Sequence, residues 1–144
     1  MRKEYKNDQG QYHREDGRPA ITHPNGTQYW WINGQLHRID GPAIIYPDET
    51  QAWCLNGKWH RIDGPAIIRP DGYQAWYLNG KRHRIDGPAV IRPDGTQYWY
   101  INGKKLTKNQ VLIAKRMLAD PAWTGIPMYL SDPELSLVIE RIYK

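Results

Sequence analysis

The sequence predicts a mainly β protein, a single-layer antiparallel meander of about four stacked β-hairpin repeats with a small helical cap at the C-terminus. Two observations predict this fold class. Tryptophans recur every 23 residues, as do Asn-Gly pairs, and self-similarity at such a step indicates a repeat architecture. The repeating tryptophans are Trp30, Trp53, Trp76 and Trp99, and the Asn-Gly pairs begin at Asn33, Asn56, Asn79 and Asn102.

Each repeat contains three chain-reversal signals. Asn-Gly after an aromatic run predicts a tight hairpin, because a type I′ turn needs positive φ at both central positions. Pro-Asp-Gly, at residues 70–72 and 93–95, predicts a turn closed by a left-handed glycine, and Asp-Gly-Pro predicts the third reversal. Glu49 replaces that glycine in the second repeat, so we expect a strained or different turn there. The runs between turns, such as 65–69 and 73–78, have the length and residue types of strands.

The motif His-Arg-Ile-Asp-Gly-Pro-Ala occurs three times, and a degenerate copy begins at His13. We expect His and Arg to hydrogen-bond the turn, and Asp to accept from turn amides or from Arg. Because strands lie about 4.8 Å apart, equivalent residues of adjacent repeats are about 10 Å apart, so neighbouring histidines cannot share a metal ion. We also expect the tryptophan column to pack the repeats together. The structural residues of the motif are His37, His60, His83, Asp40, Asp63 and Asp86.

Positions that vary between repeats are less tied to the common fold, so they are the better candidates for contact with a partner. Two such columns flank the tryptophan and point to the opposite side of the strand. Tyrosine and arginine together are typical of interface hot spots, although they also stack bases and neutralise phosphates. Lysines beside the Asn-Gly turns have a second interpretation, a solvated edge that resists aggregation. The candidate partner-binding residues are Tyr29, Trp31, Tyr46, Arg69, Tyr73, Tyr77, Arg82, Arg92, Tyr98 and Tyr100.

Composition favours a soluble, cytoplasmic protein without a catalytic site. The 144 residues suit one domain, and a formal net charge of +5 favours an acidic partner, with ordinary solubility as the alternative explanation. Cys54 is the single cysteine, which excludes an internal disulfide and fits a reducing compartment. The chain has no recognisable signal peptide, membrane-length apolar run, nucleophile motif, phosphate loop or paired cysteines for zinc, so we expect neither an enzyme nor a cofactor.

The repeat resembles the MORN (membrane occupation and recognition nexus) family, in which an aromatic residue precedes Gly-Lys-x-His and a later Asp-Gly. The matching residues are Trp76, Asn79, Gly80, Lys81, His83, Asp94 and Gly95, and the resemblance covers roughly residues 12–105. After the histidine this chain has Arg-x-Asp-Gly-Pro-Ala in place of the family's glycine, a variant similar to repeats of small bacterial and bacteriophage proteins. The resemblance implies an interaction scaffold. It further implies a phage or bacterial protein that binds and inhibits a host enzyme or defence factor in the host cytoplasm.

The 23-residue step ends near Lys105, which divides the chain into a repeat sheet (1–106) and a helical segment (107–144). Thr107 and Gln110 form a capping-box pattern ahead of an apolar-periodic run that predicts a helix ending near residues 120–121. A second helix is expected from Ser131, with an apolar stripe at Leu135, Val138, Ile139 and Ile142. These helices either cap the open edge of the last hairpin or bind a partner or a second copy.

Three functional hypotheses follow from the sequence. The first is a non-enzymatic protein-binding module. The second is a binder of nucleic acid or nucleotides through a basic aromatic face, which predicts affinity that falls steeply with salt. The third is contact with an anionic membrane, which acidic residues in every repeat disfavour, as they disfavour the second.

Overall fold

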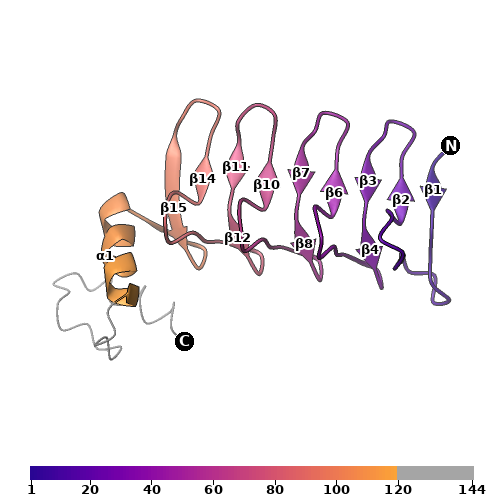
Figure 1. The fold of residues 1–144 in the computed structure, drawn as a ribbon, viewed down its shortest axis with the longest axis horizontal. Coiled ribbons are helices and arrows are strands. Elements are labelled where there is room, and N and C mark those ends of the chain that lie inside the picture. Colours follow the sequence, from indigo (N-terminus) through magenta and orange to yellow (C-terminus); the bar gives the residue numbers. More distant parts are fainter. Residues whose placement is uncertain (120–144) are drawn as a thin grey trace.

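The computed structural model describes residues 1–119, which form an open antiparallel meander with one helix at its end (Figure 1). Each strand of the main sheet pairs with the strand that follows it there, so the predicted fold class is confirmed. In order, the ten strands are β1 (Lys3–Glu4), β2 (Ile21–Thr22), β3 (Gln28–Tyr29), β6 (Ile44–Ile45), β7 (Gln51–Ala52), β10 (Ile67–Ile68), β11 (Gln74–Ala75), β14 (Val90–Ile91), β15 (Gln97–Ile101) and β16 (Lys104–Leu106).

Three two-stranded hairpins extend the repeats beyond the main sheet, and each is closed by an Asn-Gly turn. They pair β4 (Trp31–Ile32) with β5 (Gln35–Leu36), β8 (Cys54–Leu55) with β9 (Lys58–Trp59), and β12 (Tyr77–Leu78) with β13 (Lys81–Arg82). Asn56 and Gly57 have φ of 49° and 75°, and the other three Asn-Gly pairs also have positive φ. The conformation predicted for these turns is therefore confirmed.

The turns at the other end of the repeats use a single left-handed residue. Gly72 has a φ of 93°, and its N–H donates to the Arg69 carbonyl at 3.1 Å. Glu49 occupies the same place with a φ of 68°, and it keeps the equivalent bond to the Tyr46 carbonyl at 3.0 Å. The turn of the second repeat is thus strained, as expected, but it is not a different turn. A left-handed conformation costs a residue with a side chain about 1–2 kcal/mol.

The strand predicted over residues 73–78 is interrupted at Trp76, and Trp30 and Trp53 interrupt the earlier repeats in the same way. The reason is a change of hydrogen-bonding partner. The Trp76 N–H donates to the Ala89 carbonyl of the next repeat at 2.8 Å, whereas its carbonyl accepts from His83 of its own hairpin at 3.1 Å. Trp99 has no following repeat, and there β15 runs on without a break.

The repeat array begins earlier than the resemblance indicates. β1 pairs with β2, and a bridge between Lys6 and Tyr12 closes a turn ending in Gly10, which has a φ of 76°. In this partial repeat Tyr5 takes the place of the tryptophan, because the Arg14 guanidinium lies 3.9 Å from the centre of its ring. The Asn-to-Gly turn signal at residues 7–10 is the feature of the sequence that could have indicated this unit.

The helix α1 (Lys108–Ala119) packs against the last hairpin (Figure 1). Its predicted capping box is confirmed: the Thr107 N–H donates to Gln110 Oε1 at 2.8 Å, and the Gln110 N–H donates to Thr107 Oγ1 at 3.2 Å. One buried cluster joins the hairpin to the helix, and it consists of Ile101, Leu106, Val111 and Ala114. α1 therefore covers the end of the sheet. The second helix predicted from Ser131 lies outside the described residues.

Candidate functional site

Strand register separates the sheet into two faces. In β15, alternation places Tyr98 and Tyr100 on one face and Trp99 and Ile101 on the other, where α1 packs. We call the first the tyrosine face and the second the loop face, because the His-Arg-Ile-Asp-Gly-Pro loops cover it. The predicted partner-binding residues belong to the tyrosine face, as their contacts and their positions in the repeat indicate. They are Tyr29, Trp31, Tyr46, Arg69, Tyr73, Tyr77, Arg82, Arg92, Tyr98 and Tyr100.

Side chains of the tyrosine face contact one another across repeats. The rings of Tyr29 and Tyr46 meet edge to face with their centroids 6.4 Å apart. Arg82 joins two repeats, because its Nε donates to the Tyr77 hydroxyl at 3.2 Å and its Nη1 donates to the Tyr100 hydroxyl at 3.3 Å. These contacts hold the aromatic rings in place before any partner arrives.

Arginines also lie over tyrosine rings on this face. The Arg69 guanidinium is 4.6 Å from the Tyr73 ring centre, and that of Arg92 is 4.9 Å from the Tyr98 ring centre. The same Tyr98 ring is also contacted by a lysine, because Lys105 Nζ lies 4.4 Å from its centre. Such cation–π pairs keep long side chains ordered at the surface.

Not every position of these columns is available to a partner. Ala52, Ala75 and Cys54 occupy the same columns and are buried. At these positions the residue type varies between repeats because of core packing. Variation between repeats is therefore not enough to identify residues that can contact a partner. Burial also raises the pKa of the Cys54 thiol to about 12, which leaves it protonated and unreactive at neutral pH.

The charges of the two faces differ. Within residues 1–119, none of the arginines of the tyrosine face forms an ion pair with a carboxylate, and nearby Asp48, Asp71 and Asp94 accept turn N–H groups at 2.9 Å. The aspartates of the His-Arg motif pair instead with arginines on the loop face. Asp48 and Asp94 nevertheless lie close enough to Arg69 and Arg92 for the charges of these arginines to contribute to the lowered pKa of each carboxyl, so the positive charge of the tyrosine face is offset in part at these turns.

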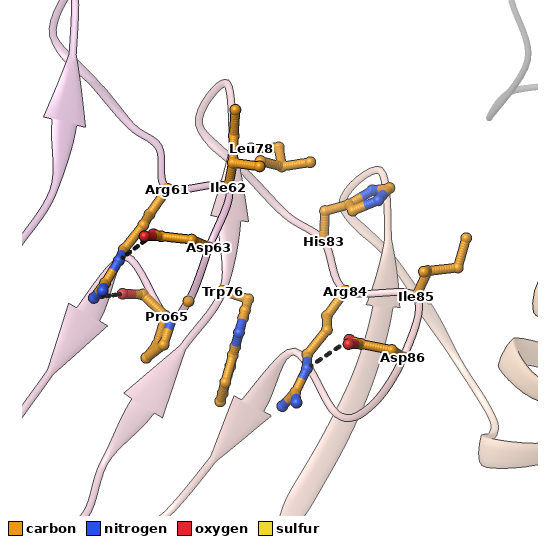
Figure 2. Close-up of a pocket in the computed structure, with 11 residues that line it drawn as sticks. Arg61, Ile62, Asp63, Pro65, Trp76, Leu78, His83, Arg84, Ile85 and Asp86 are labelled. Carbon is orange, nitrogen blue, oxygen red and sulfur yellow. Dashed lines mark hydrogen bonds and ion pairs between the residues drawn. The ribbon is translucent and has the colours of Figure 1, made fainter. Parts of the chain in front are cut away.

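The loop face is built on a repeated arginine. Arg61 lies over the Trp53 ring at 3.9 Å, its Nε donates to Asp63 Oδ1 at 2.8 Å, and its Nη1 donates to the Pro65 carbonyl at 3.2 Å. Arg38 and Arg84 make the same three contacts, and Figure 2 shows those of Arg61 and Arg84 with their aspartates. The hydrogen bond from Arg61 lowers the pKa of the Asp63 carboxyl. Trp30, Trp53 and Trp76 therefore each pack against the arginine of their own repeat.

The glycine of this loop has a steric role. A Cβ on Gly87 would lie 2.8 Å from Arg84 Cζ, closer than carbon atoms of unbonded side chains approach. Gly41 and Gly64 are similarly close to their arginines, at 3.0 and 3.1 Å. The guanidinium is therefore held between a tryptophan ring and the backbone of its own loop.

The histidines link neighbouring repeats. His60 Nδ1 accepts the N–H of Asn79 in the Asn-Gly turn one repeat further on, at 3.0 Å, and three other histidines make the equivalent bond. The histidines therefore hydrogen-bond a turn, as the sequence predicts, and this turn belongs to the following repeat. In residues 1–119, no group of three or more His, Cys, Asp or Glu side chains could hold a metal ion.

Acidification is expected to weaken the link made by His83. Burial lowers the pKa of His83, so the unfolded chain takes up a proton first, as pH falls below about 6.5. The free energy of unfolding should therefore be highest above that pH and decrease below it, and protonation also removes the Nδ1 acceptor of Asn102 N–H. Urea titrations at pH 7.5 and 5.5 measure this. His83→Gln, which keeps a neutral acceptor, should show a smaller decrease than the parent chain.

The fold and surface define an open β-hairpin repeat protein with two dissimilar faces. Comparisons find no matching family model, no matching curated protein and no matching solved structure. No helix in the described part of the chain is long and apolar enough to cross a membrane.

Proposed function

We propose that the chain is a non-enzymatic module that binds another protein through the tyrosine face. One observation carries this proposal: tyrosines lie along one face of successive repeats, and arginines without carboxylate ion pairs bridge or cover four of them, namely Tyr73, Tyr77, Tyr98 and Tyr100. Tyrosine and arginine contribute most to the energy of protein interfaces. Their side chains are already ordered by mutual contacts, so less conformational entropy is lost on binding.

The charge of this face specifies the partner further. Positive side chains that lack ion pairs favour an acidic surface, and they accelerate association with it at low salt. A finer proposal rests on the resemblance to MORN-like repeats of phage and bacterial proteins. In it, this chain is a small phage or bacterial protein that binds and inhibits a host enzyme or defence factor in the cytoplasm. Blocking that partner's acidic surface would be the inhibitory step.

Affinity purification with a paired variant tests the proposal. Arg69 and Arg92 are both exposed, so the double variant Arg69→Ala/Arg92→Ala should fold normally. The parent chain should retain one protein in stoichiometric amount, and the variant should retain at least about tenfold less, as expected for the loss of two interface arginines. Glu15→Ala on the loop face is the control and should retain the protein. Equal retention by the double variant and the parent would contradict the tyrosine face as the binding surface.

Nucleic acid is the second candidate, and it is favoured by the same arginines, since guanidinium groups over aromatic rings suit stacked bases and phosphates. A labelled single-stranded oligonucleotide is titrated at 50 and 200 mM salt. Binding that weakens steeply with salt and is lost in the double variant would support this candidate over a protein partner. Absence of binding at low salt would eliminate it.

A further inference from the structure

The loop face contains large exposed apolar side chains that the sequence analysis did not single out. Ile39 and Ile62 are 85% and 86% exposed, and both occupy the third position of the His-Arg-Ile-Asp-Gly-Pro-Ala motif. Apolar residues recur at this position in three copies, whereas the first copy has Glu15. Aliphatic side chains this exposed, in a row, are typical of a contact surface.

These isoleucines line two grooves between successive loops. One groove, of about 620 Å³, lies between Ile62 and Ile85 with Trp76 and Leu78 among its lining residues (Figure 2). The other, of about 570 Å³, is its equivalent one repeat earlier, and Ile62 lines both. The two grooves therefore repeat at the step of the array, and Ile62 lies between them.

The equivalent groove at the end of the array is filled by the chain's own helix. It contains Ile85 and Trp99, and α1 begins where the next His-Arg loop would follow. Side chains of Val111 and Leu112 line this groove, whose volume is only about 190 Å³. The protein thus shows which occupant suits the site, namely the aliphatic side chains of a helix.

The rim of the grooves is acidic. The motif carboxylates are 76%, 83% and 65% exposed at Asp40, Asp63 and Asp86, whereas their arginine partners are only 21–24% exposed. At the filled groove, α1 contributes Lys108 and Lys115 to the lining. The Arg84 hydrogen bond is the main cause that lowers the pKa of Asp86, and the charge of Lys115 also contributes. Basic side chains beside the aliphatic ones therefore complement the rim.

We propose that the two open grooves bind a basic amphipathic helix of a partner protein, with aliphatic side chains seven residues apart in neighbouring grooves. One repeat advances two strands, or about 9.6 Å. Seven residues of an α-helix advance about 10.5 Å and return to the same face. In an extended strand the residue about 10 Å further on points to the opposite side, so a strand cannot fill both grooves. This site is separate from the tyrosine face.

A peptide of residues 107–119, acetylated and amidated, serves as the probe. It carries Val111 and Leu118 seven residues apart, together with Lys108, Lys115 and Arg116. Added to the full-length chain, it should bind saturably, become helical by circular dichroism, and shift the indole NMR signals of the tryptophans in both grooves. The peptide variant Val111→Asp/Leu118→Asp should not bind.

Ile62→Glu in the full-length chain provides the decisive comparison. The substitution should fold, because Ile62 is exposed and Glu15 holds the same position in the first copy. Loss of one buried isoleucine contact should weaken peptide binding by about tenfold or more. Arg69→Ala on the tyrosine face should leave the affinity unchanged. This result is independent of the outcome of the affinity purification.

Other results would overturn the proposal in distinguishable ways. Unchanged affinity in Ile62→Glu would exclude the grooves as the peptide site, and weakening by Arg69→Ala would move the site to the tyrosine face. Concentration-dependent dimers of the full chain that Ile62→Glu abolishes would identify a second copy as the occupant. An Ile62 methyl group shielded from a soluble paramagnetic agent would show that the chain itself covers the grooves.

Discussion

Trp30→Ala is expected to lower the free energy of unfolding by about 3–5 kcal/mol, the range for truncation of a buried large aromatic side chain. Trp30 is 7% exposed and packs in a cluster with Ala43 and Cys54. Its Nε1 donates to the Gly17 carbonyl of the preceding loop at 2.9 Å, and the Arg38 guanidinium lies 4.1 Å from its ring. Alanine removes these contacts together and leaves a cavity. Urea unfolding followed by far-UV circular dichroism measures the change.

Trp30→Phe is the matched control for this prediction. Phenylalanine keeps an aromatic surface for Arg38 but lacks the N–H that reaches Gly17, so it should cost clearly less than alanine. If Trp30→Ala lowered the free energy of unfolding by less than about 1 kcal/mol, the stacked arginine and tryptophan would not be a main source of stability.

Ile101→Ala should produce the second large effect, a decrease of about 2–5 kcal/mol in the free energy of unfolding. The side chain is fully buried and packs with Leu106, Val111 and Ala114, which connect β15 and β16 to α1. The variant should also loosen α1, because an isolated helix of this length is marginal in water and depends on packing. Hydrogen exchange of the α1 amides measures the loosening, and urea unfolding measures the loss of stability.

Ile113→Ala is the appropriate control on the same helix. Ile113 is partly exposed and lies outside the buried cluster, so its truncation should change the free energy of unfolding far less than Ile101→Ala. Faster exchange in α1 after Ile101→Ala, with unchanged exchange in β2 and β3, would locate the effect at the end of the array. Uniformly faster exchange in all repeats would contradict a local cap.

Much of the fold could be predicted because its turns are encoded locally. Asn-Gly pairs adopt positive φ without help from the rest of the chain, and their 23-residue step sets the length of each repeat. The interruption at Trp76 could not be predicted, because it depends on bonds to Ala89 and His83 that form only when repeats stack. The partial repeat at Tyr5 was missed because its motif is degenerate.

The candidate site was predicted in a similarly uneven way. Column by column, the sequence indicates the aromatic and basic residues of the tyrosine face, and the structure brings Tyr77, Arg82 and Tyr100 into direct contact. Variability between repeats did not distinguish those residues from Cys54, which is buried. Exposure depends on the curvature and packing of neighbouring strands, and residue type alone does not report it.

The amino-acid sequence alone determined the hairpin repeat, its turn conformations and the capping box of α1, because each depends on interactions between residues close together in the chain. Only the tertiary structure decided that Ile39 and Ile62 are exposed while Ile85 packs against α1. The three isoleucines lie in identical motifs, so no local signal separates them. Their environments differ because repeats and helix meet across 23 or more residues, and burial is a property of that assembly.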